Sequence, residues 1–513
     1  MTLSNVTVNT QNFVFRQDKN VIKDKRIILK TKGTLNPNTK SLYLSPLEIS
    51  GTPGTVHIPE LTIANWSDIQ NKFKTRATAN LDLGKLVKAY GDFIQLPEKT
   101  RISGKGRFDL DIDLSNPDSQ MLKLKGDISP FKITGKNLPT ISEKKVNFDV
   151  ALKRRASDQA LAIENLQLDS RPLFIAASGN IDRQGTKRIL DTQGTMAPDF
   201  NLISYYLKDV LGPNIQISGK AKKPFQFKMI TDENRKLDLL KSMEFAGQFH
   251  INSINAYGLE IAPLDIPIRI LHSSADAKMH GSANGGVLSL QPIIDLRKTP
   301  YMLRIPNNTE ILKNADITGE VTEELLGMIH PLFKGSQVKK GRVGLFMKHF
   351  KWPLAAEARN EAAFAGTLRL RNVKLKASPM LSSLLSIAKV KERNIKIGDL
   401  DIEFVGRNGR IETAPIQLNI GDFPLILSGS VGFDKSMDYE AKIPLGEKLV
   451  GKDLSKFLQG MAITVPIRGT ASKPEIDKNA AQQKASPSKQ ESGQKTVEQE
   501  VLDLMQNIFK KKK

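Results

Sequence analysis

Apolar and polar residues alternate through most of the chain with the period of a β-strand. In FAGTLRLRNVKLK, at 364–376, apolar side chains fall on one side and arginine or lysine on the other, and DLDIEFVG at 399–406 repeats the arrangement. Glycines and turn residues interrupt this alternation roughly every 8 to 15 positions. The pattern therefore predicts roughly 30 strands of an antiparallel sheet with one wet and one apolar face.

Three of these strand-like segments are similar to one another. LKGDISPFKITGKNLP, FAGQFHINSINAYGLE and FAGTLRLRNVKLKASP align on glycines that are 121 and 119 residues apart, namely Gly126, Gly247 and Gly366. In each segment the alternation slips by one place shortly after the glycine. The slips run from Ile128 to Phe131, from Ile251 to Ile254 and from Leu370 to Val373, and each predicts a β-bulge.

A second series of glycines has nearly the same period. TRISGKGRFDLDI, IQISGKAKKPFQF, VKKGRVGLFMKHF and VPIRGTASKPEI align at intervals of 115, 122 and 128, on Gly104, Gly219, Gly341 and Gly469. Each follows a short amphipathic segment expected to be helical: LGKLVKAYGDF, FNLISYYLKDVL, TEELLGMIHPLF and DLSKFLQG. A unit of several strands, one short helix and a glycine-marked strand is thus used about four times, every 120 residues or so.

The fold class follows from these repeats. We predict a mainly-β body over residues 1–470, built as one long repetitive antiparallel sheet with a few short helices. The helices are too few and too short to cover the apolar face, which would aggregate if left bare. A second half of the same sheet, a curl that closes the sheet on itself, or a bound apolar ligand would each cover it. Periodicity alone does not choose between them.

Composition excludes several classes of function. The 76 Lys and Arg against 54 Asp and Glu give a net charge of +22, but much of the basic charge stands singly between apolar residues, as at Arg369 and Arg371, which indicates a solvated strand face. Aromatic residues are 6% and scattered, so we expect no nucleic-acid partner. With no cysteine, the chain has no disulfide, cysteine metal site or thiol nucleophile.

Candidate catalytic residues carry little signal. The triplet Asp109, Asp111 and Asp113 in DLDIDL could bind calcium, yet its alternation with apolar residues favours an outer strand face. GEKLVGKD at 446–453 imitates a phosphate loop, but Asp453 replaces the magnesium-binding Ser or Thr. No metal-ligand spacing links the six histidines, which are His57, His250, His272, His280, His330 and His349. We therefore predict no enzyme activity, no metal and no cofactor.

The C-terminal segment differs from the strand-like body. Residues 471–495 are polar and of low complexity, which predicts a flexible linker. Thr496 can cap a helix over residues 496–513 that ends in lysines. Its apolar stripe, expected to contact a membrane or a protein partner, consists of Val497, Val501, Leu504, Met505, Ile508 and Phe509. The alternative is a stripe that folds back on the sheet.

The region 364–477 resembles the C-terminal part of the AsmA-like family, in the superfamily that includes TamB and YhdP. The matching features are the glycine-led strand, the short helix, GRNGRIETAPIQL with its Asn-Gly turn at Asn408 and Gly409, the strand from Gly429 to Phe433, and PIRGTASKP from Pro466 to Pro474. The internal repeats extend the resemblance over nearly the whole chain. The family's usual N-terminal membrane helix is missing here, since Met1 opens directly onto strand-like sequence. Either this protein is not exported by its own signal, or the sequence lacks its natural start.

The resemblance implies a periplasmic, inner-membrane-associated protein whose sheet curls into an elongated apolar groove that carries phospholipid between the inner and outer membranes. The expected partners are phospholipids, a membrane surface and an inner- or outer-membrane protein. The residues expected to line the groove are Leu368, Leu370, Val373, Leu375, Leu400, Ile402, Phe404, Leu425, Leu427, Val431 and Phe433. The alternative function is a scaffold or assembly factor for outer-membrane proteins, acting through sheet-edge and tail interactions.

Overall fold

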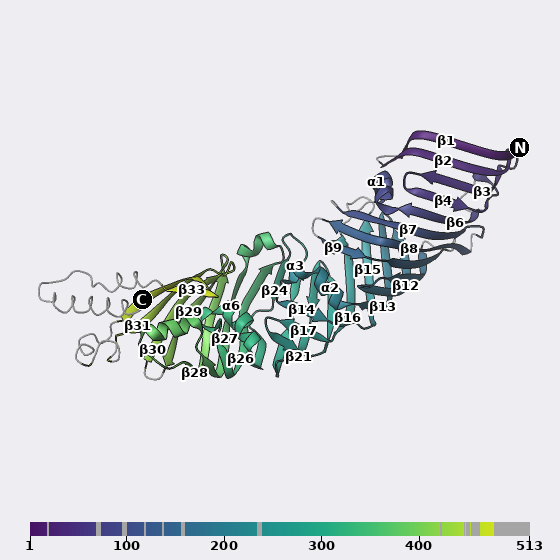
Figure 1. Ribbon diagram of the computed structural model, residues 1–513. Coiled ribbons are helices and arrows are strands. Elements are labelled where there is room, and N and C mark those ends of the chain that lie inside the picture. Colours follow the sequence, from purple (N-terminus) through teal and green to yellow (C-terminus); the bar gives the residue numbers. More distant parts are fainter. Residues whose placement is uncertain are drawn as a thin grey trace. The chain divides into compact units, whose positions relative to one another are not determined.

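The predicted fold class is confirmed: within the residues that the structure describes, the chain forms one antiparallel sheet of 33 strands with a few short helices (Figure 1). The computed structural model describes residues 1–17, 20–67, 73–94, 100–116, 119–135, 138–154, 160–232, 239–420, 423–445, 447, 452 and 462–476. Contacts divide the chain into an N-terminal unit (Met1–Asp209, Ser218–Ile251 and Asp265–Ser273) and a C-terminal unit (Val210–Ile217, Asn252–Leu264 and Ser274–Lys513).

Most strands of the N-terminal unit are long. They are β1 (Thr2–Gln17), β2 (Asn20–Asn36), β3 (Ser41–Gly51), β4 (Gly54–Ile58), β5 (Leu61–Ile63), β6 (Phe73–Asp82), β7 (Arg101–Asp113), β8 (Gln120–Gly135), β9 (Leu138–Glu143), β10 (Val146–Arg154), β11 (Leu161–Asp169), β12 (Leu173–Gln184), β13 (Lys187–Pro198), β15 (Lys223–Asp232), β16 (Met243–Ile251) and β19 (Leu264–Leu271). The helices in this part of the chain are α1 (Leu83–Ile94), α2 (Phe200–Tyr206), α3 (Lys208–Leu211) and α4 (Leu239–Ser242).

The C-terminal unit begins with short strands and continues with long ones. They are β14 (Ile215–Ser218), β17 (Ser253–Ala256), β18 (Leu259–Ile261), β20 (Ser274–Ala277), β21 (Met279–Ala283), β22 (Gly286–Leu290), β23 (Ile293–Asp295), β24 (Met302–Ile305), β25 (Thr309–Asp316), β26 (Gln337–Pro353), β27 (Ala363–Lys376), β28 (Asn394–Arg407), β29 (Arg410–Ile420), β30 (Phe423–Gly432), β31 (Met437–Pro444), β32 (Ala462–Thr470) and β33 (Lys473–Ile476). Its helical elements are α5 (Gly319–Val321), the π-helical η3 (Thr322–Leu326), α6 (Gly327–Ile329), η4 (Pro331–Phe333), η5 (Ala356–Glu361) and α7 (Pro379–Ile387).

At two places, a glycine of the second series lies opposite the β-bulge that follows a glycine of the first series. Gly104 and Gly341 have φ of +145° and +156°, which side chains other than glycine rarely adopt. Each lies opposite an extra residue in the neighbouring strand: between Ser129 and Lys132 in β8, and between Arg371 and Lys374 in β27. The predicted bulges are thus confirmed at these two places.

The third predicted bulge takes another form. From Ile251 to Ile254 the strand breaks at Asn252, which separates β16 from β17. The apolar alternation is reset there by an interruption of the strand.

Helices lie where the sequence predicts them ahead of Gly104, Gly219 and Gly341. These helices are α1, α2 with α3, and the run from α5 to η4. The fourth segment, DLSKFLQG, lies outside the described residues, as do most of the predicted linker and all of the tail helix at 496–513. Strand β33 falls within the range predicted as linker, so the boundary predicted at residue 470 was placed too early.

The C-terminal unit has a dry core, contrary to the expectation that no helical layer covers the sheet. The helical run Gly319–Phe333 buries Val321, Leu326 and Phe333 completely, and α7 does the same with Leu381 and Leu385. A Cβ on Gly258, beside β18, would lie within 2.5 Å of the backbone of Glu320 and Val321, so this run passes close to the sheet. At its far end the His330 ring packs edge-on against Tyr439 of β31, with centroids 4.9 Å apart.

His330 is a buried histidine that must stay neutral for the core to form. Its Nδ1 accepts a hydrogen bond from the Leu332 N–H at 3.1 Å, so the ring proton sits on Nε2, which has no partner among the described residues. Burial lowers the pKa of His330 from its usual value near 6.5 to about 3. Between these two values the unfolded chain binds the extra proton, so the stability of the fold decreases as pH falls below about 6.5.

We therefore expect acidification to weaken the fold through this residue. Lowering pH from 7.5 to 5 should reduce the free energy of unfolding by about 2 kcal/mol more in wild type than in His330→Asn, which keeps an acceptor but does not titrate. Denaturant unfolding at both pH values measures this difference. His280→Asn, at an exposed histidine, is the control and should retain the wild-type pH dependence. Equal pH dependence in wild type and His330→Asn would contradict the assignment.

Candidate apolar binding face

The predicted groove residues belong to the core of the C-terminal unit. Leu400 and Phe433 are partly exposed, whereas the other nine are at most 5% exposed, namely Leu368, Leu370, Val373, Leu375, Ile402, Phe404, Leu425, Leu427 and Val431. Phe364 packs against both Phe404 and Phe433, with ring centroids 6.2 and 6.3 Å apart. A side chain enclosed in this way has protein neighbours where an acyl chain would have to lie. The expectation of an open groove at these residues is therefore corrected.

The N-terminal unit carries the partly open apolar face. Three rows of directly paired residues cross its strands from β7 towards β15 through β8, β10, β11, β12 and β13. The first row is Phe108, Gly126, Phe148, Leu168, Ile175 and Met196; the second is Leu110, Leu124, Val150, Leu166, Ala177, Gly194 and Phe225; the third is Ile112, Leu122, Leu152, Ile163, Gly179, Thr192 and Phe227. We call the large apolar side chains of these rows the apolar face.

Burial distinguishes this face from the core of the C-terminal unit. Among its large apolar side chains, Ile163 and Phe225 are buried and the others are partly exposed. Phe148 and Phe108 close the first row over Gly126, since a Cβ there would stand 2.9 Å from one ring and 3.2 Å from the other. The second row ends at Phe225, whose ring stacks on that of Phe245 in β16 with centroids 6.2 Å apart. The result is a continuous apolar surface that water partly reaches.

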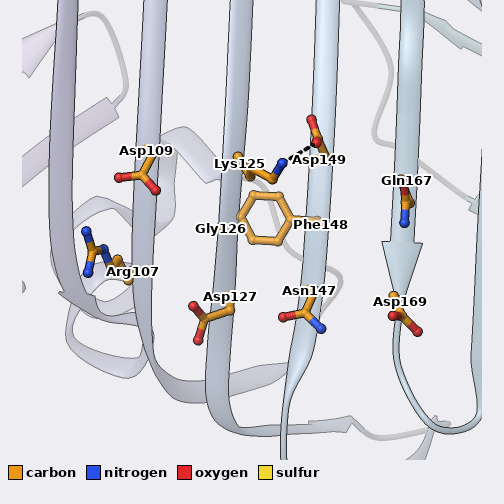
Figure 2. A pocket seen from close by; sticks show the side chains of 10 residues that line it. All are labelled: Arg107, Asp109, Lys125, Gly126, Asp127, Asn147, Phe148, Asp149, Gln167 and Asp169. Atoms are coloured by element: carbon orange, nitrogen blue, oxygen red, sulfur yellow. Dashed lines mark ion pairs between the residues drawn. The ribbon is translucent and has the colours of Figure 1, made fainter.

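The opposite side of the same strands is polar. Figure 2 shows Arg107, Asp109, Lys125 and Asp149 among the residues around a pocket of about 480 Å³ on β7 to β11. Lys125 pairs with Asp149 at 3.0 Å, and the register places charged side chains of neighbouring strands opposite one another. Surface pairs of this kind add little stability but keep this side wet.

The DLDIDL triplet lies on this polar side. Asp111 pairs with Arg76 at 3.3 Å and Asp113 with Lys74 at 2.9 Å. The Ser115 hydroxyl and the Lys74 ammonium lower the pKa of Asp113 to about 2. Asp111 and Asp113 thus pair with cations, and the triplet alternates with apolar residues along β7. The three carboxylates therefore belong to an outer strand face.

Other candidate chemistry is reported for the described residues only. Within them, no group of three His, Cys, Asp or Glu side chains could hold a metal ion, and no helix is long and apolar enough to cross a membrane. His250 Nδ1 lies within hydrogen-bond distance of Asp265 at 2.8 Å, and Lys223 pairs with the same carboxylate at 3.1 Å. Most of GEKLVGKD and all six stripe residues from Val497 to Phe509 lie outside the described ranges.

Comparison with known proteins adds no assignment to this geometry. No protein-family model matches the chain, and no curated protein sequence matches it.

A buried and a partly exposed apolar position should respond differently to a charge. Leu370→Glu places a carboxylate at a fully buried site of the C-terminal unit, and we expect it to lower the free energy of unfolding by about 3 to 5 kcal/mol. Leu124→Glu on the apolar face should cost about 1 kcal/mol, because that carboxylate reaches water. Thermal and denaturant unfolding measure both.

The matched control for Leu370→Glu is Lys374→Glu, on the solvent side of the same strand and paired with Lys340 and Lys396. It should leave stability within about 0.5 kcal/mol of wild type. A stable Leu370→Glu protein would show that the C-terminal unit is open at this point, and a collapsed Leu124→Glu protein would show that the apolar face is closed.

Proposed function

We propose that this protein carries phospholipid between the inner and outer membranes of the bacterial envelope, with acyl chains held on the apolar face of the N-terminal unit. The observation that supports the proposal is the set of three apolar rows, interrupted by glycines and Thr192, whose large side chains stay partly exposed except at Ile163 and Phe225, while the predicted groove residues of the C-terminal unit are mostly buried. Six strand-to-strand steps from β7 to β15 extend roughly 29 Å at about 4.8 Å each. One leaflet's acyl chain spans about 15 Å of the bilayer core, so the rows are long enough for it.

The physical reason for such a surface is the cost of exposing acyl chains to water. Each exposed CH₂ costs about 0.8 kcal/mol. An acyl chain that passes from the bilayer directly onto an apolar protein surface therefore avoids most of the barrier to transfer, without any chemical step. The polar headgroup then remains in solvent. The resemblance of residues 364–477 to the AsmA-like family supports the same function and a periplasmic location. Covering the apolar face with lipid also removes the tendency of a bare face to aggregate.

The proposal predicts phospholipid bound to the purified protein. Mass spectrometry of protein purified without detergent should detect phospholipid in wild type, and Leu124→Glu should retain several-fold less because its carboxylate lies in the acyl-chain path. Ser178→Glu is the control: Ser178 is exposed on the polar side of β12, opposite Gln193, so this variant should keep the wild-type amount.

Two outcomes would count against the proposal. Wild type free of phospholipid would favour the alternative of a scaffold for outer-membrane proteins, which has no reason to carry lipid. Full lipid content in a folded Leu124→Glu protein would show that the lipid lies elsewhere.

The lysine-ended segment at 496–513 is proposed to contact the anionic membrane surface. Deleting residues 496–513 should leave the melting temperature of the sheet unchanged and reduce binding to vesicles that contain anionic phospholipid, because the apolar stripe and terminal lysines are lost. Vesicle co-sedimentation at low and physiological salt measures the change. Unchanged binding would instead favour docking of the stripe on a protein partner or on the sheet.

A further inference from the structure

Helix α2 lies across the strand ends at one rim of the apolar face. At its first residue, the Phe200 ring meets Phe249 of β16 edge-on, with centroids 5.4 Å apart. At its last residue, the Tyr206 hydroxyl donates to β9, where it lies 2.6 Å from Glu143 Oε1 and 2.9 Å from the Ser142 carbonyl oxygen. The helix therefore contacts β16 at one end and β9 at the other.

The two ends of α2 are held in different ways. Its N-terminus is fixed by backbone hydrogen bonds. The Asp199 N–H donates to the Pro172 carbonyl oxygen at 2.8 Å, and the Phe200 N–H donates to the Gly219 carbonyl oxygen at 2.9 Å. Lys220 adds an ion pair to Asp199 at 3.4 Å. The C-terminal end is held to β9 by the side chain of Tyr206. This asymmetry is that of a hinge at one end and a latch at the other.

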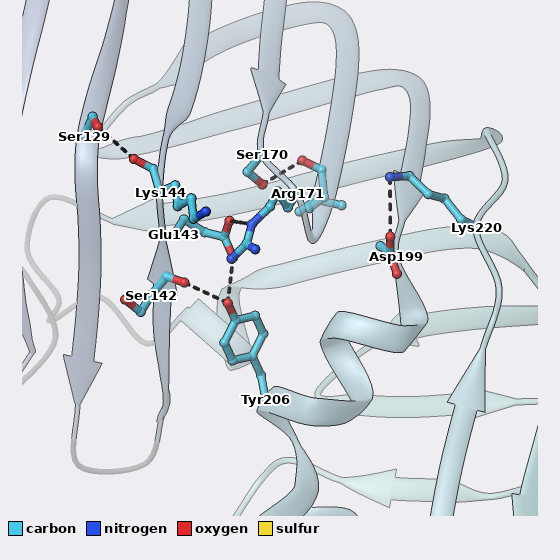
Figure 3. Close-up of polar contacts among 10 residues, drawn as sticks. Ser129, Ser142, Glu143, Lys144, Ser170, Arg171, Asp199, Tyr206 and Lys220 are labelled. Atoms are coloured by element: carbon cyan, nitrogen blue, oxygen red, sulfur yellow. Dashed lines mark hydrogen bonds and ion pairs between the residues drawn. The ribbon is translucent and has the colours of Figure 1, made fainter.

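Figure 3 shows the Glu143 carboxylate between Arg171 and Tyr206, at the centre of the latch. Glu143 is 2% exposed and lies directly opposite Phe131, which puts it on the apolar side of the sheet. Arg171, from the loop between β11 and β12, reaches it with Nε at 2.8 Å and Nη2 at 3.4 Å. Strand β9, the β11–β12 loop and α2, which are distant in sequence, thus meet at one carboxylate. Arg171 and Tyr206 both donate hydrogen bonds to it.

Helix α2 is only partly buried. None of its seven residues is buried, and Tyr205, next to the latch, is 73% exposed. Helices that bury few apolar contacts open with a small free energy, and this makes them the mobile elements of a fold. The helical run of the C-terminal unit is the opposite case, since Val321, Leu326 and Phe333 have no exposed surface.

We infer that α2 is a gate at the rim of the apolar face, closed by the Tyr206–Glu143 hydrogen bond and opened when the helix unwinds from its C-terminal end and swings about its N-terminal hinge to admit or release an acyl chain. This inference rests on the proposed function, and it adds the place where the ligand enters. What passes the gate is an acyl chain of the phospholipid, for which a C16 fatty acid is the probe. Glu143 stays paired with Arg171 when the gate opens, so opening leaves no bare charge on the apolar side.

Tyr206→Phe removes the latch hydroxyl alone, and Tyr205→Phe removes the same atom from the exposed neighbour as a matched control. Two readouts are needed. Hydrogen exchange follows the amides of Ile203 and Leu207, which donate to Asp199 and Ile203. Stopped-flow fluorescence follows binding and release of a fluorescent C16 fatty acid by the full chain.

We expect Tyr206→Phe to speed exchange of both amides roughly tenfold or more, since a hydrogen bond to a charged group is lost. Binding and release of the fatty acid should accelerate together, with the dissociation constant within about threefold of wild type, and Tyr205→Phe should match wild type throughout.

A merely structural latch would speed amide exchange and leave both fatty-acid rates unchanged, which would overturn the gate. Unchanged amide exchange in Tyr206→Phe would overturn the latch itself. If none of the three proteins binds the fatty acid, the proposed function fails and the gate with it, an outcome distinct from equal rates in proteins that bind.

Discussion

The apolar face of a one-sided antiparallel sheet has to be shielded from water, and the two units meet this constraint differently. In the C-terminal unit, the helical run Gly319–Phe333 and α7 supply fully buried side chains, so the sheet and helices enclose a dry core. In the N-terminal unit, α1 contacts β2 and β7, and α2 contacts strand ends. The rows through Leu124 and Val150 remain partly exposed there. The same alternating strand pattern therefore produces a dry core in one unit and a partly exposed apolar face in the other.

A glycine opposite a β-bulge occurs in both units, at Gly104 and at Gly341. A side chain at Gly104 would place its Cβ 2.5 Å from the Pro130 carbonyl oxygen, so the two strands approach closely only because the glycine has none. The extra residue in β8 then turns the alternation over, which keeps Phe131 and Ile133 on the apolar side beyond the bulge. Strand β9 continues from this extension and carries Glu143 to the rim. Gly104 and the latch therefore depend on the same local geometry.

Strand periodicity, marker glycines and helix positions could all be predicted, because each is a local property of the sequence. Period two identifies which side chains share a face, but Leu370 and Leu124 have the same alternation and differ in what lies above them. That difference depends on helix composition: LLGMIHPLF is apolar enough to be enclosed, whereas FNLISYY carries Asn201, Ser204 and two tyrosines. The latch could not be predicted, since Arg171 and Tyr206 are 28 and 63 residues from Glu143. Only the bulge-directed path of β9 brings them together.

A buried carboxylate on the apolar side of a sheet needs a reason beyond stability. Removing an ionised group from water costs several kcal/mol, and an apolar residue of similar size is often at least as stable in such a place. What an apolar residue does not provide is dependence on particular donors with defined geometry. At Glu143, the C-terminal end of α2 is held by the hydroxyl of Tyr206, while the guanidinium of Arg171, itself half exposed, keeps the carboxylate satisfied whether or not that hydroxyl is present. The charge thus separates the stability of the sheet from the position of the helix, which an apolar contact would couple.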